Sequence, residues 1–338
     1  MTKKEKTVKP PSRYKNFWER NRQSSGLLLR STIRQWSVAL LRIVILFGLC
    51  FLILQPLLNK LALSFMEEND LYDPTIITIP RNFTTANYKL ASTLMTFQKA
   101  LINSVFSSLG VAICQVVACT IVGYGFARFK FRFKGFWFAC VMLCIIVPPQ
   151  TFMSSLYLNF RFFDIFGIFR LITGKPLNLL NSVAPYFILV STCMGLKSGL
   201  YIFLLRQYFK GVPKELEEAA YVDGCGVFRT FVKIMIPDAV PMITSCFLFA
   251  YVWQWTDSLY SSFFFTKIKL LSATVRAIPD GLSQYLVRIY GQGTTATVAY
   301  SQMMTATGLL MFIAPLILIY LVAQKGFVES LSQTGIKM

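Results

Sequence analysis

Six apolar stretches of about 20 residues recur along this chain, and they restrict its fold more than any other feature. A helix of that length spans a hydrocarbon core of about 30 Å at 1.5 Å per residue. The stretches lie at residues 36–58, 101–126, 136–158, 183–205, 240–264 and 302–323. The sequence therefore predicts an all-α polytopic membrane protein, with six transmembrane helices in a domain at 36–338 that follows a basic segment at 1–35.

Composition supports this fold class and excludes others. The chain is 55% hydrophobic and only 14% charged, whereas ordinary soluble proteins carry about 25% charged residues. Soluble, disordered and fibrous classes are therefore excluded. The net charge of +19 would suggest a nucleic-acid partner in a soluble protein. In a membrane protein the same excess is explained by orientation and by contact with anionic lipid, so we expect membrane lipid and no nucleic acid as a partner.

The positions of the basic residues predict the orientation of the chain. Residues 1–35 carry ten of the 34 Lys and Arg residues, and the short loop at 127–135 carries four more. Lys and Arg concentrate in the cytoplasmic loops of membrane proteins, and short loops carry the strongest signal. We therefore expect both termini to be cytoplasmic.

Residue types that support catalysis or metal binding are scarce. The chain contains no histidine, and its eight cysteines lie mostly in apolar stretches without CxxC spacing. The longest pieces outside the expected spans, at 59–98 and 266–301, are too short for a soluble catalytic domain. We therefore expect no catalytic residue, no metal site and no cofactor in this chain, which is not predicted to be an enzyme.

The segment at 206–239 has the sharpest local pattern. Pro213 suits a first helical turn, and the glutamates that follow it complement the positive end of a helix dipole. Gly224 suits the left-handed turn that ends a helix, and Pro237 ends a second helix at 227–236. On these residues alone, two interpretations remain open, a docking surface for a partner and a solvated loop that re-enters the bundle.

A resemblance distinguishes between them. The residues Glu218-Ala219-Ala220-x-x-Asp223-Gly224, followed by Ile234-x-x-Pro237, resemble the EAA loop of permease subunits of ATP-binding-cassette importers. Other stretches resemble the maltose-type, MalG-like carbohydrate permeases. These are Ala127-Arg128-Phe129, Val147-Pro148-Pro149-Gln150 and Trp253-Gln-Trp255-Thr-Asp257.

The resemblance implies a fold, a function and a set of partners. The fold is that of type I ABC importer permeases, and the coupling loop lies at 206–239. The function is half of a translocation pathway for sugars or oligosaccharides in a bacterial cytoplasmic membrane. The partners are a second, homologous permease subunit, two ATPase subunits that bind ATP and Mg²⁺, and an extracellular solute-binding protein. The residues expected to couple to the ATPase are Glu218, Ala219, Ala220, Asp223, Gly224, Ile234 and Pro237.

Polar and aromatic residues inside the spans indicate where solute passes. Trp253 and Asp257 are four residues apart and are expected on one helix face, where a ring can stack on a sugar and a carboxylate can accept hydroxyl hydrogen bonds. We expect these residues, with Trp255 and Gln150, to line the pathway. The alternatives are an aromatic belt at the membrane interface and, at Pro148-Pro149, a purely structural kink. Lys197 either lines the cavity or extends to the interface.

Two other functions remain as alternatives. One is a permease of the same importer class for a polyamine or an inorganic anion. The other is a secondary transporter driven by protons or sodium. That class requires intramembrane carboxylates, histidine relays or inverted repeats, and Asp257 alone meets that requirement.

Overall fold

The computed structural model describes residues 22, 27–76, 78–165 and 167–336. The chain divides into two compact units, Met1–Leu61 and Ala62–Met338. Helix α2 (Leu27–Ser64) provides almost all of the described part of the first unit. Most of the predicted basic segment at 1–35 lies outside the described residues, and its boundary at residue 35 stays a prediction.

The second unit consists of helices, and its β structure among the described residues is limited to two isolated bridges. Its first half contains η1 (Glu68–Tyr72), α3 (Ala86–Met95), α4 (Phe97–Arg128), α5 (Lys134–Ile146), η2 (Pro149–Phe152), α6 (Met153–Arg161), α7 (Ile168–Thr173) and α8 (Ala184–Ser191). Its second half contains α9 (Ser198–Gly211), α10 (Glu215–Val222), α11 (Val227–Thr230), η3 (Phe231–Met235), α12 (Ile236–Asp238), α13 (Val240–Thr256), α14 (Leu259–Phe264), α15 (Leu271–Arg276), α16 (Ile278–Tyr290) and α17 (Val298–Ile336).

Three helices among the described residues are long and apolar enough to cross a membrane, at Thr32–Ser64, Phe97–Arg128 and Val298–Val322. Two bent helix pairs raise the number to five if each pair forms one span. The predicted number of six is therefore not confirmed. The difference arises at residues 183–205, where α8 and α9 replace one continuous helix because Cys193 and Lys197 between them adopt left-handed backbone conformations, with φ of 58° and 63°.

The break at Pro148-Pro149 follows directly from the sequence. Pro148 is extended, with ψ of 134°, because a residue that precedes a proline is disfavoured in the α region. Helix α5 therefore ends at Ile146, and the pair Lys134–Ile146 and Pro149–Arg161 bends by 98°. The predicted interruption of the third apolar stretch is confirmed.

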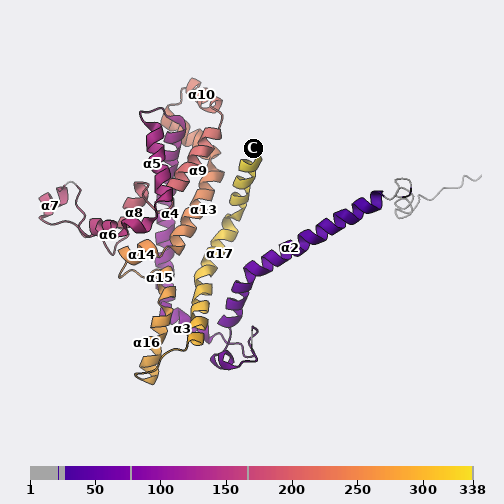
Figure 1. The fold of residues 1–338 in the computed structure, drawn as a ribbon. Coiled ribbons are helices and arrows are strands. Elements are labelled where there is room, and N and C mark those ends of the chain that lie inside the picture. The colour runs from indigo at the N-terminus through magenta and orange to yellow at the C-terminus, as the bar shows by residue number, and fades with distance from the viewer. Residues whose placement is uncertain (1–21, 23–26, 77, 166, 337–338) are drawn as a thin grey trace, which may run out of the picture. The chain divides into compact units, whose positions relative to one another are not determined.

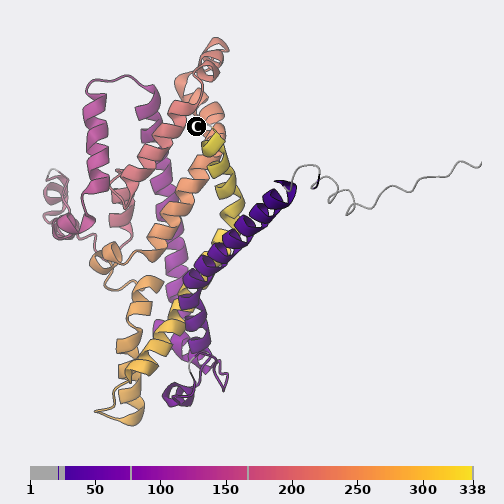
Figure 2. The same ribbon diagram turned by 45° about the vertical axis from the view of Figure 1, so that its right-hand side comes forward.

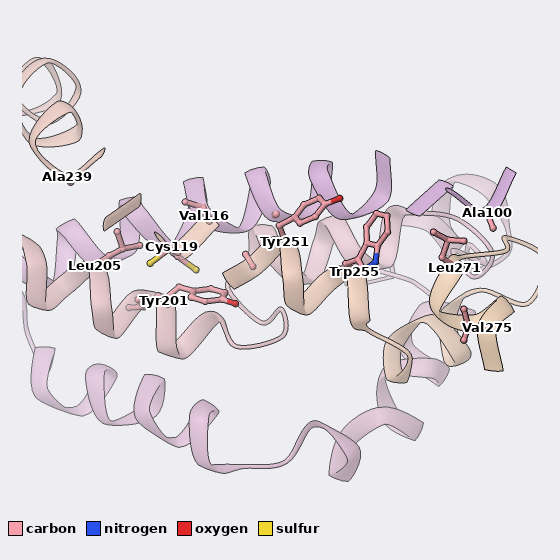
Figure 3. Close-up of a cluster of buried hydrophobic side chains, with 14 of the residues drawn as sticks. Ala100, Val116, Cys119, Tyr201, Leu205, Ala239, Tyr251, Trp255, Leu271 and Val275 are labelled. Atoms are coloured by element: carbon pink, nitrogen blue, oxygen red, sulfur yellow. The ribbon is translucent and has the colours of Figure 1, made fainter. Parts of the chain in front are cut away.

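Helix α4 lies at the centre of the second unit and contacts α9 and α13 along its length, and Figure 1 shows the three running side by side. Gly123 permits the close approach of α9, since a Cβ there would lie 2.9 Å from Cβ of Leu205. Large side chains such as Tyr201, Tyr251 and Trp255 fill the space between these helices (Figure 3). The central helices therefore form one packed core.

The two ends of this unit carry different elements. Helix α10 lies at one end, beyond the C-terminal ends of α4 and α9 (Figures 1 and 2). Helices α3 and α16 pack together at the opposite end. The segment with the EAA pattern therefore occupies one end of the bundle, and the break between α8 and α9 lies partway along it.

Candidate functional site: the α10–α11 loop and the cavity beside Trp253

The EAA segment folds as two short helices joined by a tight turn. Helix α10 begins two residues after Pro213, and its acidic first turn contains three glutamates. The second helical stretch starts with α11 and passes through the π-helical turn η3 into α12. Helix α12 contains Pro237 and ends at Asp238, so the prediction that Pro237 ends the second helix is wrong. The predicted arrangement of two short helices is nevertheless present.

Gly224 makes the turn between them. Its φ is +80°, a left-handed conformation that costs other residues about 1–2 kcal/mol. The amide of Cys225 donates to the Ala220 carbonyl at 2.9 Å, and the amide of Gly224 donates to the Tyr221 carbonyl at 3.1 Å. These two bonds form a Schellman motif, which fixes the angle at which the chain leaves α10.

Glu217 anchors α10 to the end of α4. Its Oε2 lies 3.2 Å from Nε of Arg128, and both side chains are less than a tenth exposed. Its Oε1 accepts a 2.8 Å hydrogen bond from the hydroxyl of Tyr124. Arg128 also donates from Nη2 to the carbonyl of Val212 at 2.7 Å. A buried charge needs such partners, so α10 is held to α4 by a buried ion pair supported by two hydrogen bonds, although Nε of Arg128 itself donates no hydrogen bond to the described residues.

A second tie joins the end of α9 to α12. The hydroxyl of Tyr208 donates to the carbonyl oxygen of Asp238 at 2.6 Å. Burial and the neighbouring Asp238 carboxylate raise the pKa of Tyr208 to about 12. The hydroxyl therefore keeps its proton at neutral pH, and both ends of the loop are fixed to the bundle.

The loop exposes several large apolar side chains among its polar residues. Val222 is 87% exposed and Phe228 is 79% exposed. The other large apolar side chains exposed on this segment are Leu216, Tyr221, Val227 and Val232. Exposed apolar side chains that cluster and are flanked by polar residues mark protein interaction sites. We call this set, with Val222 and Phe228, the α10–α11 face.

The predicted coupling residues divide between this face and the core. Glu218, Ala219, Asp223, Gly224 and Pro237 are exposed, whereas Ile234 is half-buried and Ala220 is buried. Ala220 therefore packs inward. Sequence reasoning missed Glu217 and its partners, because a short helix with three glutamates in its first turn gives no signal of which one faces the bundle.

The second candidate site is a cavity of about 270 Å³ where the broken helices meet. Gln150, Trp253, Asp257 and Lys197 all line it. Nζ of Lys197 lies 5.0 Å from the centre of the Trp253 ring, within the range of a cation–π contact. Three of the four predicted pathway residues therefore lie together, and Lys197 joins them at the cavity wall.

The position of Lys197 depends on Gln115 in α4. The side chain of Gln115 is 2% exposed, and its Nε2 donates to the carbonyl of Leu196 at 2.7 Å and to the hydroxyl of Ser198 at 2.8 Å. These bonds hold the connection between α8 and α9, where Lys197 adopts its left-handed conformation. Lys197 is thereby placed beside Trp253.

Asp257 borders the cavity, but its carboxylate is already occupied. Oδ1 accepts from the amides of Leu259 and Tyr260 at 3.1 and 3.2 Å. Oδ2 accepts from the amide of Ser261 at 3.0 Å and from the hydroxyl of Tyr186 at 2.7 Å. Helix α13 ends at Thr256, so the expectation that Trp253 and Asp257 share a helix face is wrong. Asp257 instead satisfies the first amides of α14.

Trp255 is separated from the cavity. It is 2% exposed, and its Nε1 donates to the carbonyl of Phe312 in α17 at 3.2 Å. Its ring packs against Tyr251 and Phe312 with centroids 5.8 and 6.0 Å away. The two tryptophans are both predicted to line the pathway, but they lie in different places. Trp253 lines the cavity, whereas Trp255 lies in the core (Figure 3).

Comparisons with known proteins relate the chain to membrane components of transport systems. Residues 116–329 match the family described as "Binding-protein-dependent transport system inner membrane component". The chain is similar to the probable ABC transporter permease protein YurM of Bacillus subtilis, at 28% identity over 90% of this chain and 91% of YurM. It is also similar to the arabinooligosaccharides transport system permease protein AraQ of Halalkalibacterium halodurans, at 26% identity over 86% of this chain and 93% of AraQ.

A solved structure shares the fold. It belongs to a bacterial ABC transporter involved in the import of the acidic polysaccharide alginate. The two chains superpose with a TM-score of 0.66 at 18% sequence identity, over 87% of this chain and 97% of the other. The likeness at this identity concerns the arrangement of the helices.

Proposed function

Because this chain belongs to the family of binding-protein-dependent transport system inner membrane components, we propose that it is the permease subunit of an ATP-driven importer for sugars or oligosaccharides. AraQ, the relative named for arabinooligosaccharide transport, matches it over most of both lengths, which supports the sugar class. In this role the chain forms half of the pathway beside a second, homologous permease subunit. It hydrolyses nothing itself.

The observation that carries the proposal is the α10–α11 face together with its anchor. Exposed apolar side chains such as Val222 and Phe228 need a partner to remove them from water. Glu217, one turn away on α10, is fixed to Arg128 of α4. A subunit that docks on this face would therefore be mechanically joined to the central helix of the bundle.

We assign this face to a partner ATPase, which binds ATP and Mg²⁺ in its own site. When two such ATPases close around ATP, α10 would move with its ATPase. The contacts of Glu217 with Arg128 and Tyr124 would then carry the movement to α4. Because α4 packs against α13, and α13 carries Trp253 at the cavity wall, the cavity would change its shape and access.

The cavity beside Trp253 supplies groups suited to a sugar. An aromatic ring offers an apolar face to the C–H surface of a pyranose or furanose, and Gln150 offers an amide that can donate to and accept from hydroxyls. Lys197 offers three further donors. We place the solute pathway at this cavity, with Gln150, Trp253 and Lys197 facing it and Asp257 shaping its rim.

Uptake by the complete transporter tests the proposal. The purified complex, with its solute-binding protein, is reconstituted in liposomes loaded with ATP and supplied with labelled arabino- and malto-oligosaccharides. Uptake that requires internal ATP and the binding protein supports the function. Uptake that follows a proton or sodium gradient without ATP would establish the secondary-transporter alternative. ATP-dependent uptake of spermidine, phosphate or sulfate in place of every oligosaccharide would establish the other alternative.

A further inference from the structure

A second, larger cavity lies beside the N-terminal turns of α4, at the end of that helix away from α10. Its volume is about 660 Å³, and α4, α8 and the loop between α14 and α15 form its walls. Lys99, Lys267 and Lys269 line it, whereas no acidic side chain does. None of their three ammonium groups has an ion-pair or hydrogen-bond partner in the described part of the chain. The cavity therefore presents uncompensated positive charge.

Two hydrogen bonds hold the loop that carries Lys267 and Lys269 against α4. The side-chain amide of Asn103 donates to the carbonyl of Lys269 at 3.1 Å, and the hydroxyl of Ser104 accepts from the amide of Leu271 at 2.8 Å. These bonds hold the loop with Lys267 and Lys269 against the first turns of α4. The positive charge is therefore built into the fold near the N-terminal end of that helix.

The other lining side chains of the cavity are mostly apolar. Ile102 and Phe106 on α4, Phe187 on α8, and Phe265 and Ile268 line it. Ile102 and Phe106 are 56% and 72% exposed. This exposed apolar stripe continues along α4 towards its C-terminal end with Leu109, Ile113 and Val117. A ligand with a negative head and a long apolar tail would thus find matching surface along its whole length.

Ser107 is an independent sign of a ligand. Its side chain lines the cavity and is 8% exposed, yet its hydroxyl has no hydrogen-bond partner in the structure. A buried hydroxyl without a hydrogen-bond partner is destabilising. Ser107 follows Asn103 by about one helical turn, roughly 6 Å, and so lies one turn further along α4 than the contact between Asn103 and Lys269. That is where a carbonyl attached to the ligand's negative head would accept its hydrogen bond.

We propose that this cavity binds one anionic phospholipid from the leaflet opposite α10. The phosphate lies among Lys99, Lys267 and Lys269, the Ser107 hydroxyl donates to a glycerol ester carbonyl, and the acyl chains follow the apolar stripe from Phe106. A free anion would use the lysines but not the stripe. The site does not depend on which solute is transported.

Native mass spectrometry of the complete transporter in detergent tests the site. Dioleoylphosphatidylglycerol and dioleoylphosphatidylcholine are titrated in parallel, and bound lipid is counted. We expect one copy of the anionic lipid to be retained in preference. The triple variant K99Q/K267Q/K269Q should weaken that binding by about fivefold for each lysine removed. Ser107→Ala should weaken it further without a change of charge.

A matched triple variant controls for net charge. K89Q/K175Q/R288Q removes three exposed basic residues outside the cavity and should leave lipid retention unchanged. Equal retention of the two lipids would overturn the proposal, as would equal effects of the two triple variants. Displacement of the lipid by millimolar inorganic phosphate or glucuronate would show a site for small anions instead. A photoreactive phenylalanine analogue at position 106 tests for a protein partner. A cross-link from it to the second permease subunit, with no lipid retained, would show a protein interface instead of a lipid site.

Discussion

Arg128 and Glu217 lie 89 positions apart in the chain, but their charged groups meet at 3.2 Å in a pocket that leaves each side chain less than a tenth exposed. The pair joins the last residue of α4 to the first turn of α10. It gives the segment with the EAA pattern a rigid connection to the helix at the centre of the bundle. Tyr124, one turn earlier on α4, completes the connection.

Removal of Glu217 should weaken this connection strongly. Glu217→Ala leaves the buried charge of Arg128 without a carboxylate, and breaking a buried ion pair on one side costs about 3–5 kcal/mol. We expect a lower midpoint of thermal unfolding of the purified complex. Glu215→Ala, on the same helix turn but exposed, is the matched control and should leave the midpoint unchanged. Equal midpoints for the two variants would contradict the anchor.

Gly224 should not tolerate a side chain, although there is room for one. Nothing lies within 4 Å of a Cβ built at Gly224 or at Gly226, but only Gly224 has a positive φ. Gly224→Val should therefore cost about 1–2 kcal/mol and redirect the chain after α10. Gly226→Ala should be tolerated. The measurement is stimulation of ATP hydrolysis by the solute-loaded binding protein, which Gly224→Val should reduce. Stimulation at the wild-type level in Gly224→Val would refute the assigned turn.

The two tryptophans should respond differently to substitution. Trp253→Ala removes the ring beside Lys197 at the cavity wall, so uptake should fall while thermal stability stays near that of the wild type. Trp255→Ala empties a buried position, which typically costs about 3–5 kcal/mol. It should therefore lower the unfolding midpoint and the yield of assembled complex. The reverse pattern would place the pathway on the other side of α13.

Asp257 should behave as a structural residue. Asp257→Ala removes four accepted hydrogen bonds, three of them from the first amides of α14. Tyr186→Phe removes one, and a hydrogen bond to a charged group contributes about 1.5–3 kcal/mol. We expect unfolding midpoints in the order wild type, Tyr186→Phe, Asp257→Ala, from high to low. Unchanged stability with loss of uptake in Asp257→Ala would instead assign the carboxylate to the solute.

The sequence predicted the helical class, the break at Pro148-Pro149 and the turn at Gly224, because these depend on local apolar runs and on the backbone limits of proline and glycine. The structure departs from the sequence prediction where a distant partner decides the outcome. Whether Glu217 or Glu218 is buried depends on Arg128, which lies on another helix. The end of α13 at Thr256 depends on the amides that Asp257 caps. The break before Lys197 depends on Gln115 of α4.

The central claim is that the α10–α11 face is where the ATPase docks, and photo-cross-linking tests it most directly. A photoreactive phenylalanine analogue is placed at Phe228, 79% exposed on that face, and separately at Leu171 on α7, 87% exposed elsewhere. The assembled transporter is irradiated, and the joined peptides are identified by mass spectrometry. We predict adducts with the ATP-hydrolysing subunit from position 228 and none from position 171. Absence of ATPase adducts at 228, or equal adducts at both positions, would contradict the account.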